Sequence, residues 1–303
     1  MRKLLLGLLV LVLLFVVAAA WLVWPMAPNW PDRRPIGMLF VASGSHSSSI
    51  NPRGWFFDEK LDLTGPAGME RFRKALLDYA DTSIANLKRL NAQGAIVWDL
   101  EGEQLPHKIT FIGDPRLLNL LAPEMAPVAK EFFKKFTDAG LRVGVTIRPQ
   151  QFVMDQNGPR QTTVLNIDRI LLEKIDYART NWGATLFYID SNDSAWRPDE
   201  VLQLRLLAEQ RPDVLLMPEH HYLPYWAFTV PYVTLHRGRP DPTAGLARKL
   251  FPRSFQALDF GDAGPDALAA AWHSGDILLV RAWYWNTDCQ RVEDFENARS
   301  PTK

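Results

Sequence analysis

Short hydrophobic runs alternate with amphipathic stretches along most of the chain. Apolar runs of about four to eight residues are typical of buried strands, and helical patterns between them indicate parallel βα units. Strands of a parallel sheet are covered on both faces, which explains runs without polar interruptions. The runs are IGMLFVA (36–42), GAIVWDL (94–100), LRVGVTI (141–147), ATLFYID (184–190), DVLLMPE (213–219), YVTLHR (232–237), FQALDF (255–260) and DILLVRA (276–282).

These eight runs predict an α/β protein with a (β/α)₈ TIM barrel, because eight strands close such a barrel. An open, doubly wound sheet is the alternative. The helices after the fifth and sixth strands look short, and no helix is expected after the eighth strand. The clearest helical patterns cover 69–91, 123–139, 167–182, 198–210 and 264–273.

The N-terminal segment differs from the rest of the chain. Arg2 and Lys3 precede a run from Leu4 to Trp24 that contains no charged residue. About 20 apolar helical residues cross a bilayer, so residues 1–24 predict a single transmembrane helix. The positive-inside rule then places the globular domain on the periplasmic or extracellular side of the cell inner membrane. The small residues at 18–20 leave a cleaved signal peptide as the alternative.

The proline-rich stretch 25–35 is expected to be a short linker, so that the barrel domain covers 36–303. The chain has 34 basic and 34 acidic side chains, and this balance offers no basic face for nucleic acid. Cys289 is the one cysteine, so no disulfide forms within the chain. No Gly-x-Gly-x-x-Gly or phosphate-binding loop is present, and we expect no cofactor.

Polar side chains follow nearly every predicted strand, whereas the strands begin mainly with small or loop residues. Barrel enzymes carry their reactive groups at the carboxyl ends of the strands. Asp190 follows the fourth strand and Glu219 the fifth. Because neighbouring strands lie about 4.8 Å apart, these two carboxyl groups are the expected catalytic pair. A loop anchor for Asp190, and an ion pair of Glu219 with Arg148 or Arg281, are the structural alternatives.

Other polar and aromatic residues at the same end suit a carbohydrate, whose hydroxyl groups bind polar side chains and whose C–H faces pack on rings. For Asp99 and Glu101, an ion pair with Arg148 is an equally good explanation. The expected substrate-binding residues are Asp99, Glu101, Arg148, Gln150, Asn192, His220, His236, Asp259, Trp283 and Trp285.

Histidines near the strand ends raise the possibility of a metal-dependent hydrolase. However, the chain has no His-Glu-x-x-His motif, and the adjacent His220 and His221 point to opposite sides of an extended strand. We therefore expect no metal site.

The strand ends WDLEG (98–102), VTIRPQQ (145–151), LFYIDSN (186–192) and LLMPEH (215–220) resemble those of (β/α)₈ glycoside hydrolases, most nearly the α-galactosidase-like group. The resemblance spans residues 36 to 286. It implies that Asp190 is the nucleophile, since that group has an aspartate at the end of the fourth strand. The group's acid/base is an aspartate after the sixth strand, where this chain has His236 and Arg237, with Asp241 further along. The acid/base therefore stays open between Glu219 and Asp241.

The resulting expectation is an exported, membrane-anchored glycoside hydrolase that acts on a carbohydrate substrate. A non-catalytic carbohydrate-binding barrel of the cell envelope is the alternative, because a fold does not fix a function. The sequence leaves open the sugar, its anomer, the stereochemistry and the oligomeric state.

Overall fold

A computed structural model describes residues 26, 28–103, 111–192, 198–234, 242–259, 261 and 264–299, together with Gly7, Leu9, Val10, Val12, Leu13 and Val17. Among these residues, no helix is long and apolar enough to cross a membrane. Most of the predicted membrane segment, 1–24, lies outside the described residues, so that segment stays a prediction.

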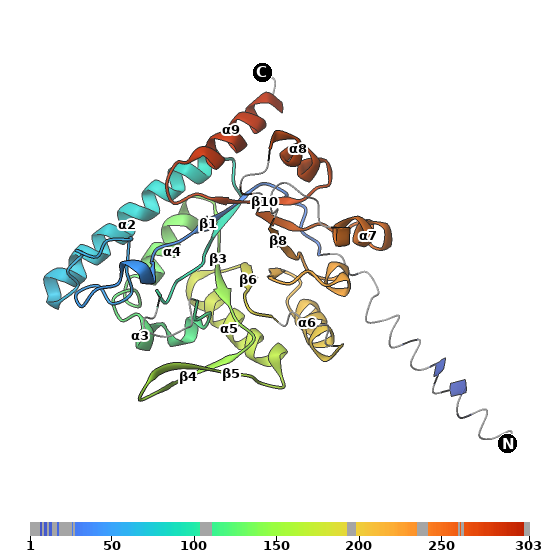
Figure 1. Ribbon diagram of the computed structural model, residues 1–303, viewed down its shortest axis with the longest axis horizontal. Coiled ribbons are helices and arrows are strands. Elements are labelled where there is room, and N and C mark those ends of the chain that lie inside the picture. Colours follow the sequence, from blue (N-terminus) through green and yellow to red (C-terminus); the bar gives the residue numbers. More distant parts are fainter. Residues whose placement is uncertain are drawn as a thin grey trace.

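Eight parallel strands form one sheet in the order β7-β6-β3-β2-β1-β10-β9-β8. Val230, two residues before β8, donates its N–H to the Leu216 carbonyl of β7 at 2.9 Å, so the two edges of the sheet meet and the sheet curls into a barrel (Figure 1). This arrangement confirms all eight predicted runs and the TIM barrel. The strands are β1 (Ile36–Leu39), β2 (Gly94–Val97), β3 (Arg142–Ile147), β6 (Leu186–Ile189), β7 (Leu215–Pro218), β8 (Tyr232–Thr234), β9 (Ala257–Asp259) and β10 (Ile277–Arg281).

Helices surround the barrel, and all five predicted helical patterns contain one (Figure 1). These helices are α2 (Gly65–Arg89), α4 (Ala129–Asp138), α5 (Ile167–Trp182), α6 (Pro198–Gln210) and α8 (Pro265–His273). Three further helices are α3 (Leu118–Leu121), α7 (Pro242–Leu250) and α9 (Thr287–Arg299). The expectation of no helix after the eighth barrel strand is therefore wrong. Helix α9 has few apolar residues, and Cys289 and Val292, three positions apart, are its fully buried side chains.

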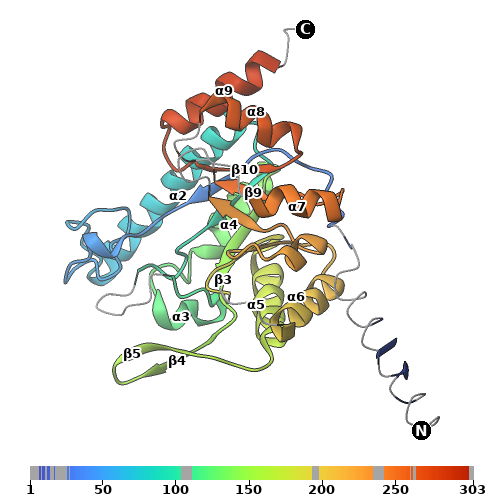
Figure 2. The same ribbon diagram turned by 45° about the vertical axis from the view of Figure 1, so that its right-hand side comes forward.

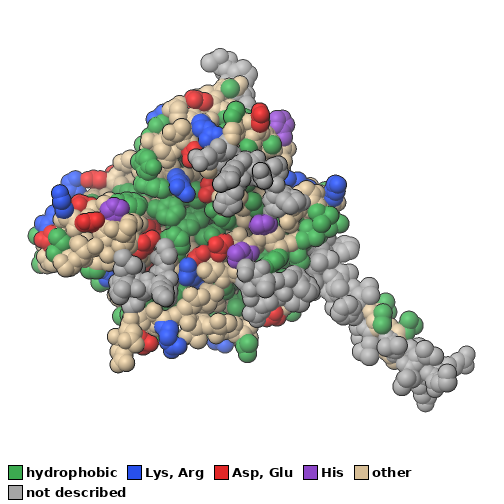
Figure 3. All heavy atoms as spheres, viewed as in Figure 1, with side chains coloured by type: hydrophobic (Ala, Val, Ile, Leu, Met, Phe, Trp, Pro, Cys, Tyr) green, Lys and Arg blue, Asp and Glu red, His purple; other side chains and the backbone are tan. Residues whose placement is uncertain are grey.

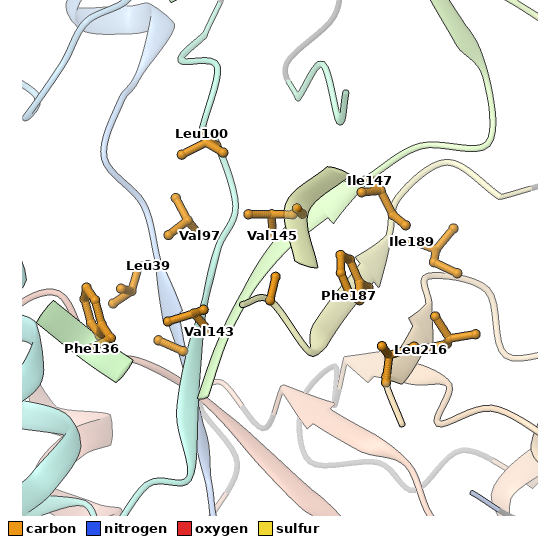
Figure 4. Close-up of a cluster of buried hydrophobic side chains, with 14 of the residues drawn as sticks. Leu39, Val97, Leu100, Phe136, Val143, Val145, Ile147, Phe187, Ile189 and Leu216 are labelled. Atoms are coloured by element: carbon orange, nitrogen blue, oxygen red, sulfur yellow. The ribbon is translucent and has the colours of Figure 1, made fainter. Parts of the chain in front are cut away.

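Side chains alternate between the inside and the outside of the barrel, as the two-residue period of a strand requires. Inside, Met38, Ile96 and Tyr188 belong to one buried cluster. Outside, side chains such as Val97, Val145 and Phe187 pack under the helices in a larger cluster, part of which is shown in Figure 4. Both faces of each strand are buried, which explains why the runs lack the polar alternation of a half-exposed sheet.

An antiparallel hairpin, β4 (Gln151–Asp155) and β5 (Gly158–Thr162), is inserted directly after β3. Both views show it projecting away from the barrel (Figures 1 and 2). Its turn needs Gly158, whose φ of 101° few other residues adopt. The sequence pattern did not predict this hairpin, because most of its side chains are exposed or half-buried and follow no hydrophobic period.

Part of the predicted linker packs across the amino-terminal end of the barrel. Trp30 is 8% exposed and lies in the same buried cluster as the barrel interior. Its indole nitrogen donates to the side chain of Gln93 (2.8 Å), directly before β2. Arg33 stacks on Phe255, before β9, at 3.3 Å from the ring centroid. The segment therefore closes the bottom of the barrel, opposite the end that carries the polar residues.

Candidate active site

Asp190 and Glu219 come together at the carboxyl end of the barrel. In the register, Ile189 pairs with Pro218, so the next residues of β6 and β7 leave the sheet at the same level. The carboxyl group of Glu219 lies close enough to that of Asp190 to raise its pKa, and it accepts from the N–H of Ser191, the residue next to Asp190, at 2.8 Å. Asp190 is 6% exposed, whereas 34% of the Glu219 side chain is exposed. The two carboxyl groups therefore lie near each other at the strand ends, and their catalytic role stays a prediction.

The electrostatics of the pair are dominated by burial and by Arg148, at the end of β3. The Arg148 guanidinium forms an ion pair with the Asp190 carboxylate. Burial raises the pKa of Asp190; the charge of Arg148 opposes that rise, and the carboxyl group of Glu219 adds to it. Arg148 therefore favours the ionised form of Asp190, and burial disfavours it.

Backbone contacts fix the two loops that carry the pair. Ser191 has a φ of 56°, unusual for a serine, and its N–H donates to Glu219 Oε2 at 2.8 Å. Asn192 is 2% exposed, and its side-chain oxygen accepts from the N–H of His220 at 3.1 Å. Gln150 donates to the Ser191 carbonyl at 2.9 Å. The loops after β3, β6 and β7 therefore hold one another.

Lys174, on α5, lies beneath this site, and the sequence did not single it out. Its side chain is 0% exposed, and its ammonium group donates to the carbonyls of Gly113 (3.1 Å), Arg148 (2.7 Å) and Gln150 (2.8 Å). Burial lowers the pKa of Lys174 to about 8. Lys174 therefore fastens the loop of Arg148 and Gln150 to a helix.

A continuous group of aromatic rings fills the top of the barrel. Trp98 stacks on Tyr188 (4.5 Å between centroids), Tyr188 meets Tyr232 edge-on (5.1 Å), and Phe40 lies between Trp98 (5.7 Å) and Trp283 (5.1 Å). Phe40, Tyr232 and Trp283 are only partly buried. In Figure 3, a hydrophobic area occupies the centre of the molecular face, with acidic side chains and histidines along its lower edge. The rings therefore form a surface on which a sugar face can pack.

Charged groups connect the aromatic rings to the carboxyl pair. Burial and then the charges of Asp190 and Glu219 raise the pKa of Tyr188. The hydroxyl of Tyr232 donates to Asp259 at 3.2 Å, and Asp259 is 8% exposed. Eight of the predicted residues lie around this end of the barrel: Asp190, Glu219, Arg148, Gln150, Asn192, His220, Asp259 and Trp283. Trp98 and Tyr188 could have been recognised as aromatic residues at inward positions of their strands.

Asp99 and Glu101 have structural contacts instead of the considered ion pair with Arg148. Asp99 is 1% exposed, and its carboxylate accepts from the N–H groups of Val41 (2.8 Å) and Ala42 (2.7 Å), which holds the end of β1. Glu101 is 2% exposed and accepts from the N–H of Asp114 at 2.9 Å. Substrate binding by these two residues remains a prediction that no contact supports.

Trp285 does not join the described site. The Trp285 ring packs under Arg89 of α2, at 3.5 Å from the guanidinium carbon, and its nitrogen donates to Gln290 of α9 (3.1 Å). These contacts favour helix packing over ligand contact. His236 and Asp241 lie outside the described residues.

Glu101 provides a prediction about stability. Burial raises its pKa from 4.5 to about 7. The folded protein thus binds a proton more tightly than the unfolded chain, and this stabilisation is complete below about pH 4.5 and lost as the pH rises through about 7. Between about pH 5 and 8, the free energy of unfolding of the wild type should fall by up to about 3 kcal/mol relative to Glu101→Gln, measured by urea unfolding. Parallel curves for the two proteins would contradict the raised pKa; Glu131→Gln, at an exposed site, is the control.

A cavity of about 400 Å³ opens beside Glu219. Its wall includes Gln150, Ser191, Asn192 and His220 from the loops described above. On the hairpin side it is formed by Gln161, Thr163, Val164, Leu165 and Ile167. Within the described part of the chain, no three His, Cys, Asp or Glu side chains are grouped so that they could hold a metal ion.

The chain is similar in structure to several solved glycoside hydrolases. They include the Thermotoga maritima alpha-fucosidase (13% identity, TM-score 0.45, 90% of this chain and 74% of that chain) and the Thermus thermophilus alpha-galactosidase in complex with stachyose (14%, 0.45, 89% and 66%). A third is the alpha-N-acetylgalactosaminidase NagBb of Bifidobacterium bifidum (12%, 0.48, 87% and 50%). No protein-family model matches the sequence, and no curated protein matches it. At these values the similarity alone decides nothing about activity, and the strand order itself identifies the chain as a (β/α)₈ barrel.

Proposed function

We propose that this protein hydrolyses a glycosidic bond at the carboxyl end of its barrel. The observation that carries the proposal is that the carboxyl groups of Asp190 and Glu219 lie close together, with Arg148 paired to Asp190, beside a partly exposed aromatic surface. A protonated carboxyl group next to an ionised one supplies both an acid and a nucleophile or base. Rings and amides beside them suit a sugar's C–H faces and hydroxyl groups.

In the proposed reaction, Asp190 acts at the anomeric carbon, either as nucleophile or as the base that activates water. The bond from that carbon to the leaving oxygen breaks, its electron pair stays on the oxygen, and Glu219 donates the proton that the oxygen takes up. Water supplies the replacing oxygen and returns a proton to the carboxyl pair. Arg148 keeps Asp190 ionised until the reaction begins.

We expect the side chain of Glu219 to move outward when substrate enters between the two carboxyl groups. Catalytic carboxyl groups stand about 5–5.5 Å apart in retaining and about 6.5–9.5 Å apart in inverting glycosidases. Glu219 can make this movement, because its side chain is 34% exposed and lies at the wall of the cavity. Asp190 is buried against Arg148 and stays in place.

A carbohydrate-binding barrel without catalysis is the second candidate. The proximity of the carboxyl groups favours it, because a pair that never separates cannot stand on both sides of a glycosidic bond.

We further propose that residues 4–24 anchor the protein in the inner membrane, with the barrel on the periplasmic or extracellular side. The run has no charged residue. The residues described within it are helical, and Leu9 and Leu13 are 66% and 62% exposed, as expected for side chains that face lipid. Arg2 and Lys3 stay on the cytoplasmic side in this orientation.

The full chain, purified in detergent micelles, tests the proposed activity. We expect hydrolysis of at least one member of a panel of 4-nitrophenyl α- and β-glycosides, and the same rate after exhaustive chelation of metal ions. Binding of a sugar by calorimetry without turnover of any member would support the binding barrel instead. Loss of turnover on chelation would indicate a metal-dependent hydrolase.

A further inference from the structure

The cavity beside Glu219 exists because of the hairpin that follows β3. Gln161, at the end of β5, and residues 163–165 form one side of the cavity, and the first turns of α6 form another. Glu219 and His220 complete the wall next to the carboxyl pair. The hairpin belongs to a separate two-stranded sheet, so the barrel alone does not build this space.

One part of the lining is polar. Amide side chains line it at Gln150, Gln161, Asn192 and Gln203, with the hydroxyl of Thr163 among them. The carboxyl groups of Asp199, Glu200 and Glu219 also belong to this part, and like the amide oxygens they can accept hydrogen bonds from sugar hydroxyl groups.

The other part of the lining is apolar and comes from Val164, Leu165 and Ile167. Leu165 is 84% exposed, unusually high for a leucine, and lies in the segment between the hairpin and α5. No lysine or arginine is among the described lining residues, so the wall offers no cation to an acidic group. A volume of about 400 Å³ lies within the range of small-ligand sites.

We propose that this cavity binds a second, uncharged sugar unit of the substrate, on the leaving-group side of the bond that is cleaved. This inference rests on the proposed function, because it takes Glu219 as the proton donor at the boundary between the two sugars. The amides bind the hydroxyl edges of that unit, and the apolar side chains cover its C–H face. The substrate is then an oligosaccharide or polysaccharide of neutral sugars.

Two substrates of the same sugar separate the cavity from the reacting site. A glycosyl fluoride has a leaving group of one atom, so it leaves the cavity empty, whereas the corresponding oligosaccharide fills it. Thr163→Trp places a large ring at the cavity wall. We expect kcat/KM for the oligosaccharide to fall by about tenfold or more, and kcat/KM for the fluoride to stay within about twofold of wild type.

Asn157→Trp, at the exposed turn of the same hairpin, is the matched control and should change neither value. Equal losses on both substrates in Thr163→Trp, or no loss on either, would overturn the proposal. Equal or better cleavage of an oligosaccharide of uronic acids would overturn the assignment to uncharged sugars.

If the wild type cleaves neither substrate, the proposed activity fails and the cavity is tested by binding alone. Titration of the neutral oligosaccharide into Asp190→Asn, with and without Thr163→Trp, is followed by calorimetry. Weaker binding with the tryptophan supports the cavity as a sugar site without catalysis, and unchanged binding refutes it.

Discussion

Asp190→Asn and Glu219→Gln are each expected to lower kcat for glycoside hydrolysis by ~10²–10⁴-fold. Asparagine keeps the shape of Asp190 and one oxygen near Arg148, but it removes the charge that acts at the anomeric carbon. Glutamine likewise removes the proton that Glu219 donates. Steady-state kinetics on whichever 4-nitrophenyl glycoside the wild type cleaves will measure both effects.

The matched control for Asp190 is Asp213→Asn. Asp213 precedes β7 at the amino-terminal end of the barrel and is also paired with an arginine, Arg179. We expect its kcat to be unchanged and all three variants to be folded, with Asp190→Asn the least stable because it leaves the buried Arg148 without its counter-charge. Full turnover by folded Asp190→Asn or Glu219→Gln would remove that residue from the mechanism. Retained sugar binding with lost turnover is the pattern that supports it.

Lys174→Met should lower the free energy of unfolding by about 3–5 kcal/mol, because it leaves three carbonyls without their donor and takes one of two cations from the buried Asp114, which keeps Arg116. The lysine is fully buried, and methionine fills a similar volume while it donates nothing. The carbonyls of Gly113, Arg148 and Gln150 would lose their hydrogen bonds, and Asp114 would lose a nearby cation at 3.5 Å.

Urea unfolding followed by circular dichroism will measure this loss. Lys134→Met is the control: Lys134 forms a surface pair with Asp138 at 2.6 Å, its side chain is 65% exposed, and such pairs contribute about 1 kcal/mol or less. Equal stability of Lys174→Met and Lys134→Met would show that Lys174 does not fasten the loop after β3.

Much of the barrel could be predicted because each strand has both faces buried, and a run such as LFYI of β6 then has no polar gap. The hairpin β4–β5 could not be predicted, because side chains such as Gln151 and Arg160 are exposed and follow no hydrophobic period. Helix α9 was missed for a related reason: its buried residues Cys289 and Val292 are too few to give a helical pattern.

The candidate site was predictable in its membership and less so in its contacts. The polar residues that follow each hydrophobic run can be identified in the sequence, so Asp190, Glu219 and Arg148 could be named as candidates. Which of several carboxylates meets Arg148 depends on loop geometry: Asp190 does, while Asp99 turns back to the N–H groups of Val41 and Ala42. The buried position of Lys174 could not be predicted from the sequence, because a lysine on an amphipathic helix is usually a surface residue.

The packing of the segment around Trp30 against the amino-terminal end of the barrel limits the direction from which substrate can reach the site. Met26 donates its N–H to the Ala227 carbonyl at 2.7 Å, so if residues 4–24 lie in a bilayer as proposed, almost no free chain separates that bilayer from the barrel. In that arrangement the amino-terminal end of the barrel faces the lipid and its opposite end faces the aqueous compartment. Headgroups of the same membrane would then be separated from the site by the height of the barrel, roughly 10–20 Å for strands of this length. Glycans that diffuse freely or belong to a more distant layer of the envelope could approach unhindered.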